Sequence, residues 1–114
     1  MPIALLFYTL LTLSKVAWTT PTTHDFGEIE KGVSKTHIFE FKNISDIPLL
    51  IDNVRTECGC TASEWEETPI ESGKIGKITV TFDATKSGYF KKKLIVWFHG
   101  QRTSEKLWIE GDVE

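Results

Sequence analysis

The only two cysteines of the chain, Cys58 and Cys60, stand one residue apart in a Cys-Gly-Cys-Thr segment at residues 58–61. Two thiols at this spacing permit three kinds of chemistry. They can stay reduced as half-buried packing residues at a turn, or they can close a disulfide. They can also bind a soft metal such as Cu(I) or react with a thiol of another protein. A bridge between residues i and i+2 closes a very small ring, so it would be strained and easily reduced.

The residues around this possible thiol site favour the reduced, structural state. Gly59 is the residue type that best tolerates the backbone of a tight ring. However, nothing else near the turn supplies a base, a third metal ligand or a resolving thiol. The redox and metal-handling readings of Cys58 and Cys60 therefore remain alternatives to the structural one.

No other set of residues has the spacing of a catalytic or metal site. The histidines His24, His37 and His99 lie in segments with no shared spacing, and no histidine, serine and acid suggest a triad. The sequence contains neither a glycine-rich phosphate loop nor an acidic calcium loop. We therefore assign no catalytic residue, metal ligand or cofactor, and we expect the protein not to be an enzyme.

Length and charge indicate one small domain that does not read nucleic acid. The chain has 114 residues, of which 40% are apolar, and a net charge of −3. A reader of the phosphate backbone would show a clustered basic surface. The only basic run, at residues 91–93, interrupts a strand-like segment. Alternation along a strand predicts that neighbouring lysines of this run point to opposite faces.

Apolar and polar residues alternate with a period of two through most of the chain, and no segment shows a helical apolar face. Turn residues separate the alternating segments about every ten residues, as in two-sheet antiparallel proteins. We predict an all-β, immunoglobulin-like antiparallel β-sandwich of about seven strands. The residues expected to point inward are Val33, His37, Phe39, Phe41, Leu49, Ile51, Ile78, Val80, Phe82, Phe90, Leu94, Val96, Phe98, Leu107, Ile109 and Val113.

The same alternation sends Ile95, Trp97 and Trp108 to the outer face of the sheet. Lys93 and Lys106 are expected beside them. Exposed, contiguous aromatic residues mark a possible interaction surface. The alternatives are that an N-terminal strand covers these side chains, or that they pack on one another across the sheet.

The N-terminal segment differs in composition from the rest of the chain. Residues 3–13 are mostly apolar, and no charged side chain precedes Lys15. This length is typical of a signal peptide and too short for a membrane span. Small residues at Thr12 and Ser14 suit a signal peptidase, whereas a cut after Ala17 would place Lys15 at the −3 position. We predict a signal-peptide-like segment at 1–17 and a domain at 18–114, although an N-terminal strand or helix packed on the domain is the alternative.

Several short motifs occur in a fixed order along the chain. They are His-Asp-Phe-Gly-Glu-Ile at 24–29, Phe-Glu-Phe-Lys-Asn at 39–43, Pro-Leu-Leu-Ile at 48–51, Cys-Gly-Cys-Thr at 58–61, and the segments 69–76 and 88–92. Together they resemble the bacterial immunoglobulin-like family named domain of unknown function fifteen-seventy-three, over residues 18–113. That family is similar in fold to Hydin-type and major-sperm-protein-like domains. One departure is Glu-Ser-Gly at 71–73, where the family usually has a proline before the glycine.

The resemblance implies a secreted or cell-envelope module, and it implies no reaction. Within the first motif we expect Phe26 to fill the core, Gly27 to permit a strand crossover, and His24 or Asp25 to hydrogen-bond nearby backbone. A binding role for His24 is the alternative.

We expect an exported protein of the periplasm, cell envelope or medium, without a membrane span in its mature form. It would act as a non-enzymatic binding or structural module for a protein or cell-envelope component. The runner-up is a thiol-based redox or metal-handling protein that uses Cys58 and Cys60. The sequence carries no indication of oligomeric state.

Overall fold

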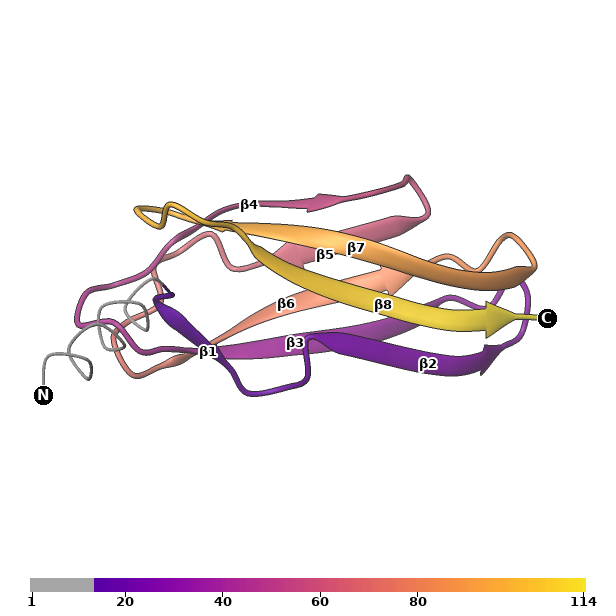
Figure 1. Ribbon diagram of the computed structural model, residues 1–114, viewed down its shortest axis with the longest axis horizontal. Coiled ribbons are helices and arrows are strands. Elements are labelled where there is room, and N and C mark those ends of the chain that lie inside the picture. Colours follow the sequence, from indigo (N-terminus) through magenta and orange to yellow (C-terminus); the bar gives the residue numbers. More distant parts are fainter. Residues whose placement is uncertain (1–13) are drawn as a thin grey trace, which may run out of the picture.

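The computed structural model describes residues 14–114, which form two facing β-sheets (Figure 1). The first sheet has the strand order β1-β3-β6-β5 and the second has the order β2-β8-β7-β4. The predicted immunoglobulin-like sandwich is therefore confirmed, with eight strands rather than about seven. Their bounds are β1 Val16–Trp18, β2 Thr23–Ile29, β3 Lys35–Asn43, β4 Ile51–Thr56, β5 Thr61–Trp65, β6 Ile75–Phe82, β7 Gly88–Phe98 and β8 Glu105–Val113.

The additional strand arises because the N-terminal part of the chain contributes to both sheets. β1 pairs antiparallel with β3 in the first sheet, and β2 pairs parallel with β8 in the second. Residues 19–22 carry the chain across, and both ends of this crossing are tied by backbone hydrogen bonds. Thr19 N–H donates to the Glu40 carbonyl at 2.9 Å, and Trp108 N–H donates to the Thr22 carbonyl at 2.8 Å. The boundary drawn from sequence between residues 17 and 18 falls inside β1; residues 1–13 lie outside the described part.

Gly27 does not mark the crossover that the sequence suggested, since the chain has already changed sheets at 19–22. It marks an irregularity within β2 instead. Its φ angle is 71°, and the pairing register with β8 shifts between Asp25 and Glu28. Glycine adopts this left-handed conformation without the steric cost of a Cβ atom. The Asp25 carboxylate accepts a hydrogen bond from the Gly27 N–H at 2.8 Å, as expected for a side chain that fixes nearby backbone.

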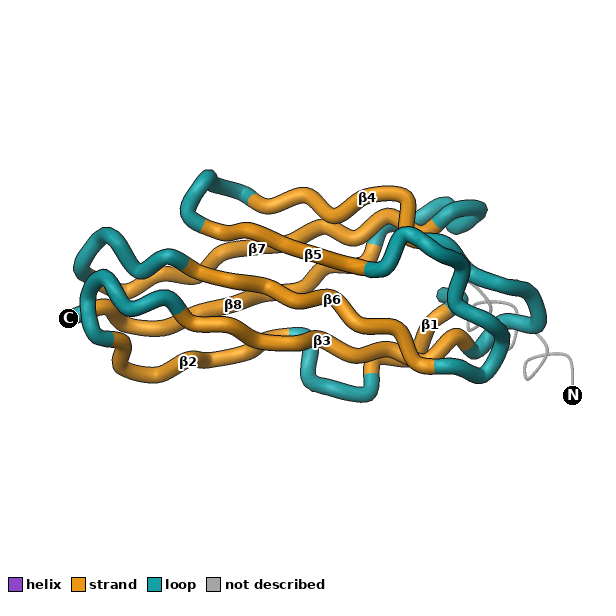
Figure 2. The backbone as a smooth tube through the Cα atoms, turned by 180° about the vertical axis from the view of Figure 1, so that it is seen from behind, coloured by secondary structure: helices purple, strands orange, loops and turns teal. Residues whose placement is uncertain are grey.

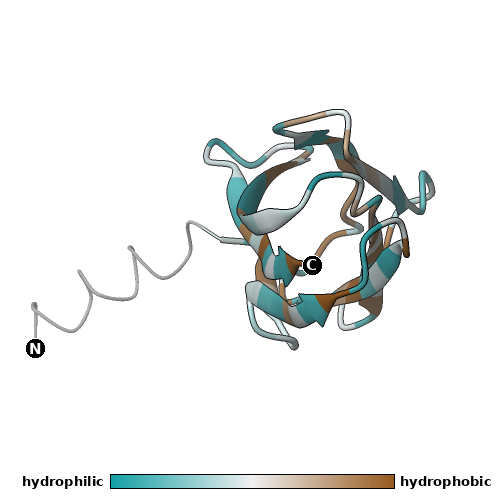
Figure 3. Ribbon diagram, turned by 90° about the vertical axis from the view of Figure 1, so that its right-hand side faces the viewer, coloured by the Kyte–Doolittle hydropathy of each residue, from teal (hydrophilic) through white to brown (hydrophobic). Residues whose placement is uncertain are grey.

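Alternating side chains from both sheets form one hydrophobic core. Figure 3 looks along the sandwich from the end that carries the C-terminus and shows apolar and polar residues alternating along the facing strands. Val33 is the exception among the expected inward residues, because it precedes β3 in a turn and is 42% exposed. The predicted core residues that are at most 4% exposed include Phe41, Ile51, Val80, Phe82, Val96 and Ile109.

Three of the connections between strands lie together at one end of the sandwich. The β2–β3, β4–β5 and β6–β7 connections all lie at this end, together with the C-terminus (Figures 1 and 2). The β4–β5 and β6–β7 connections each pass from one sheet to the other. Asp83 N–H donates to the Cys60 carbonyl at 3.0 Å, so these two connections are also joined to each other.

The described residues, 14–114, contain no helix with the length and apolar character that crossing a membrane requires.

Truncation of Phe82 to alanine should destabilise the domain by about 3–5 kcal/mol, because it leaves a cavity in a closely packed core. Phe82 is 4% exposed and its ring stacks on Phe90 with centroids 3.9 Å apart. Denaturant unfolding of the purified variant measures the loss. Ile38, 43% exposed on the outer side of β3, provides the control, since Ile38→Ala should change stability by less than about 0.5 kcal/mol. An equal loss of stability in the two variants would contradict the placement of Phe82 in the core.

Candidate functional site

Cys58 and Cys60 are joined in a disulfide at the turn between β4 and β5. Their Cα atoms lie 5.3 Å apart, within the separation that a disulfide can bridge. This differs from the reduced pair that the sequence favoured. The turn at Gly59 brings the two side chains together, and Thr61 N–H closes the turn on the Cys58 carbonyl at 3.4 Å. With each sulfur bonded to the other, neither is a thiolate ligand in this state.

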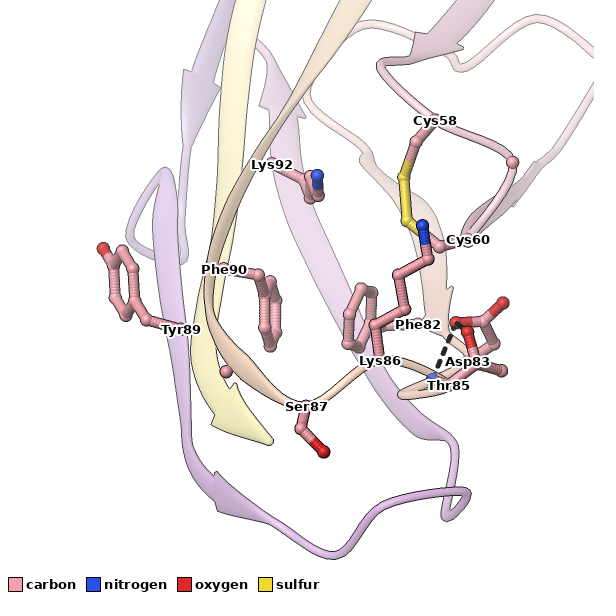
Figure 4. Close-up of a pocket in the computed structure, with 12 residues that line it drawn as sticks. Cys58, Cys60, Phe82, Asp83, Thr85, Lys86, Ser87, Tyr89, Phe90 and Lys92 are labelled. Carbon is pink, nitrogen blue, oxygen red and sulfur yellow. Dashed lines mark hydrogen bonds between the residues drawn. A yellow bond between two sulfur atoms is a disulfide. The ribbon is translucent and has the colours of Figure 1, made fainter. Parts of the chain in front are cut away.

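The disulfide borders a cavity of about 490 Å³ between the β4–β5 and β6–β7 connections. The apolar part of its wall is the stacked pair of Phe82 and Phe90. Figure 4 shows the Lys86 side chain extending toward the disulfide, while Lys92 enters from the wall formed by β7. The cavity therefore combines apolar rings, a disulfide and two amino groups.

The three consecutive lysines at 91–93 divide between the two sides of β7, as alternation predicted. Lys92 is half-buried and lines the cavity on the inner side. Lys91 and Lys93 lie on the outer side, where their amino groups are 5.3 and 5.7 Å from the ring centre of Trp108. Such cation–π contacts orient both amino groups over the indole.

Ile95, Trp97 and Trp108 lie on the outer side of the second sheet and are called here the outer aromatic face. Trp97 is 37% exposed, and the other two are half-buried. Of the alternatives left open, covering by an N-terminal strand is not seen for β1 or β2. β1 joins the other sheet, and β2 extends the second sheet beside β8 rather than over it. Their partial burial fits packing across the strands.

Basic side chains flank this face at fixed positions of the strand register. Ile95 on β7 pairs with Arg55 on β4 and with Lys106 on β8. In the next row Lys93 pairs with Trp108. Side chains at paired positions lie on the same side of a sheet. An apolar and aromatic centre is thus placed between cations from three strands.

The structure also brings together His24 on β2 and His37 on β3, which the sequence analysis did not connect. Their rings stack with centroids 3.7 Å apart and an interplanar angle of 8°. Phe26 meets His24 edge-on at 4.7 Å, and Phe39 meets His37 edge-on at 4.6 Å. Both strands carry the pattern His-x-Phe, which places the histidine and the phenylalanine on one face of each strand. That shared pattern was the available sequence indication.

The surroundings of His37 favour its neutral form. Its Nε2 atom is buried and has no hydrogen-bond partner among residues 14–114. Burial lowers the pKa of His37 below its usual value of 6.5, and the neighbouring His24 lowers it further. The pair therefore joins β2 of the second sheet to β3 of the first through stacked aromatic rings.

The third histidine takes no part in this pair. His99 follows β7, and its Nδ1 lies 3.3 Å from the carboxylate of Asp52. Across residues 14–114 no group of three or more His, Cys, Asp or Glu side chains is arranged to hold a metal ion.

One protein family has a sequence profile that matches residues 17–113 of the chain. It is described as "Protein of unknown function (DUF1573)". The match begins inside β1 and ends at the last residue of β8. No curated protein sequence matches the chain.

Solved structures share the fold at low sequence identity. The ASH / PapD-like domain 7 of human CEP192 is 14% identical with a TM-score of 0.74, covering 88% of this chain and 85% of that one. A protein of unknown function from Porphyromonas gingivalis W83 is 16% identical with a TM-score of 0.73, covering 85% of this chain and 46% of that one. WR4, a C. elegans MSP family member, is 8% identical with a TM-score of 0.60, covering 89% and 99%. These likenesses show a PapD-like and MSP-like sandwich fold and nothing about activity.

Acidification should weaken the domain through His37. Because its folded-state pKa is lowered, the unfolded chain binds more protons between that pKa and 6.5. Stability is therefore complete above 6.5 and falls as the pH drops through this window. Denaturant unfolding from about pH 8 to about pH 5 should show a steeper loss for the wild type than for His37→Gln. Ile38→Ala, an exposed substitution on β3 that changes no titratable group, is the control and should keep the wild-type slope. Equal slopes for wild type and His37→Gln would contradict the assignment.

Proposed function

Because the chain belongs to the DUF1573 family, described as proteins of unknown function, we propose its role from its own surface. The protein is a non-enzymatic binding module of the cell envelope that recognises an acidic segment of a partner protein through the outer aromatic face. The observation that carries this proposal is the aromatic and apolar centre of Ile95, Trp97 and Trp108 between basic side chains.

The composition of this face is that of a protein-binding site. Tryptophan and arginine are enriched among the residues that contribute most to binding energy, and Trp97 and Arg55 both reach solvent here. The chain as a whole carries a net charge of −3. On this face Arg55, Lys93 and Lys106 outnumber Glu57, whose carboxylate accepts a hydrogen bond from the Lys93 N–H, so the local excess is positive. Charge complementarity therefore favours an acidic partner segment.

A non-enzymatic role agrees with the fold and with the residues present. The PapD-like and MSP-like sandwich is a scaffold on which function depends on surface residues, so the fold alone supplies no activity. The two histidines that the strands bring together, His24 and His37, have their rings stacked on each other.

We also propose that the protein is exported and that the signal peptide is cut after Ser14. Val16 is 5% exposed in the core, and Lys15 N–H donates to the side-chain carbonyl of Gln101 at 2.9 Å. A cut after Ser14 keeps both contacts, whereas a cut after Ala17 removes them. The intact mass of the protein from its native host tests this, and a full-length cytoplasmic form would contradict it.

Thiol exchange at Cys58 and Cys60 is a second candidate function. It is favoured by the disulfide's position in a half-exposed turn beside the cavity and the Lys86 side chain. Cationic groups near a cysteine stabilise the thiolate that exchange releases. Metal binding by these cysteines would first require reduction of the disulfide.

Replacing Trp97 with alanine should weaken binding of an acidic partner by about 2 kcal/mol or more, as loss of a central tryptophan does in other interfaces. A suitable probe is a labelled synthetic peptide in which glutamate alternates with phenylalanine. Fluorescence anisotropy should show binding that weakens with added salt, because exposed ion pairs are screened. The same peptide with lysine in place of glutamate should bind much less.

Ile38→Ala is the matched control, since Ile38 is exposed on the outer side of the first sheet. It should leave peptide affinity unchanged. Equal loss in Trp97→Ala and Ile38→Ala, or equal binding of the glutamate and lysine peptides, would refute recognition through the outer aromatic face. If the peptide binds as expected, a photo-crosslinker at position 97, used in the envelope fraction of the native host, would identify the natural partner.

The Cys58–Cys60 disulfide should open under mild reduction while the domain stays folded. Its spacing of i and i+2 closes a small ring, which is easily reduced and restrains the unfolded chain little. Alkylation and mass analysis across glutathione mixtures should find two free thiols before circular dichroism changes. The Cys58→Ser, Cys60→Ser double variant should melt close to the wild type. A disulfide that opens only on global unfolding would rule out the exchange function.

A further inference from the structure

Lys92 occupies a position on β7 whose inward neighbours are apolar. Phe90 and Leu94, two residues away on either side, are buried, and Lys92 itself pairs with the buried Ile109 of β8. Burying a charged amino group on this side of a strand costs folding free energy unless a group of opposite charge or a water molecule binds it. The cavity beside the disulfide is where its side chain lies.

The charges that line the cavity leave one positive charge uncompensated. They are Lys86, Lys92 and Asp83. The Asp83 carboxylate accepts hydrogen bonds from the N–H and hydroxyl of Thr85, each at 3.3 Å. The ion pairs within residues 14–114 join Lys77 to Glu40 and His99 to Asp52, so neither cavity lysine belongs to one of them. A monovalent anion is the complementary ligand charge.

The remaining wall requires that the ligand also has an apolar part. The stacked rings of Phe82 and Phe90 line the cavity, and the Cys58–Cys60 disulfide borders it. The volume of about 490 Å³ falls within the range of small-molecule sites, which are mostly apolar with a few polar groups that orient the ligand. An inorganic anion would make no apolar contact with the parts of these rings that face the cavity.

We propose that this cavity binds a small amphiphile made of an apolar chain or ring and one carboxylate. The apolar part lies on Phe82 and Phe90, and the carboxylate accepts hydrogen bonds from the amino groups of Lys86 and Lys92. This site is separate from the outer aromatic face, because it lies on the opposite side of β7. Either site can therefore fail without consequence for the other.

The consecutive lysines provide a matched test of this proposal. Lys91 and Lys92 are neighbours of the same type on one strand, but only Lys92 lines the cavity. The full chain, labelled with ¹⁵N, is titrated with octanoate and followed by amide chemical shifts. These shifts locate the binding site and distinguish it from other apolar surfaces. Saturable shifts should be concentrated at residues 58–60 and 83–92.

Lys92→Met should raise the octanoate Kd about tenfold, since it removes a charge-assisted hydrogen bond. Lys86→Met should act in the same direction, and Lys91→Met should stay within about twofold of the wild type. Octanol should bind about tenfold more weakly than octanoate, and octylamine more weakly still. Amide spectra without ligand confirm that each variant is folded.

Three results would overturn the proposal. The first is the absence of saturable shifts at residues 58–60 and 83–92. The second is an equal effect of Lys91→Met and Lys92→Met, which would make the effect one of overall charge. The third is equal affinity for octanol and octanoate, which would show that the phenyl rings bind the tail without the lysines.

Discussion

The packing of the two inner sheet faces is the constraint on which the rest of the molecule depends, and β7 shows it most clearly. This strand lies between β4 and β8 and places Leu94, Val96 and Phe98 in the core. Because successive side chains of a strand point to opposite faces, burial of these three residues places Ile95 and Trp97 on the outer face. A shift of register by one residue would exchange the two sets. The large apolar area that β7 buries therefore also determines which residues form its outer surface.

The end of the sandwich with the disulfide depends on a second constraint, the passage of the chain between sheets. Three connections cross there, and two of them, β4–β5 and β6–β7, are joined by the hydrogen bond from Asp83 N–H to the Cys60 carbonyl. Side chains that are far apart in sequence, such as Cys58 and Lys86, consequently face the same space. The cavity is a result of where the strands end, and not of any local motif.

Sequence alternation was sufficient to predict the fold class, the core and the division of the lysines at 91–93, because these follow from local periodicity. It did not predict features that depend on which strands become neighbours. The contact of His24 with His37 requires β2, the edge strand of the second sheet, to lie beside β3 of the first sheet. The strand at Val16–Trp18 was hidden within a segment whose composition resembles a signal peptide. The cavity forms only where the β4–β5 and β6–β7 connections lie side by side, which no single segment of sequence reveals. The spacing of the two cysteines did not decide whether they are reduced or bonded to each other.

The parallel pairing of β2 with β8 has a mechanical consequence. Thr23 lies opposite Trp108 at one end of this pairing, and Ile29 lies opposite Val113 at the other. Tension applied between the first residue of β2 and the last residue of β8 would pull the two strands in opposite directions along their length. The hydrogen bonds between them would then be loaded together in shear instead of being opened one after another. The β2–β8 pairing can therefore carry force along the strands without opening first at one end.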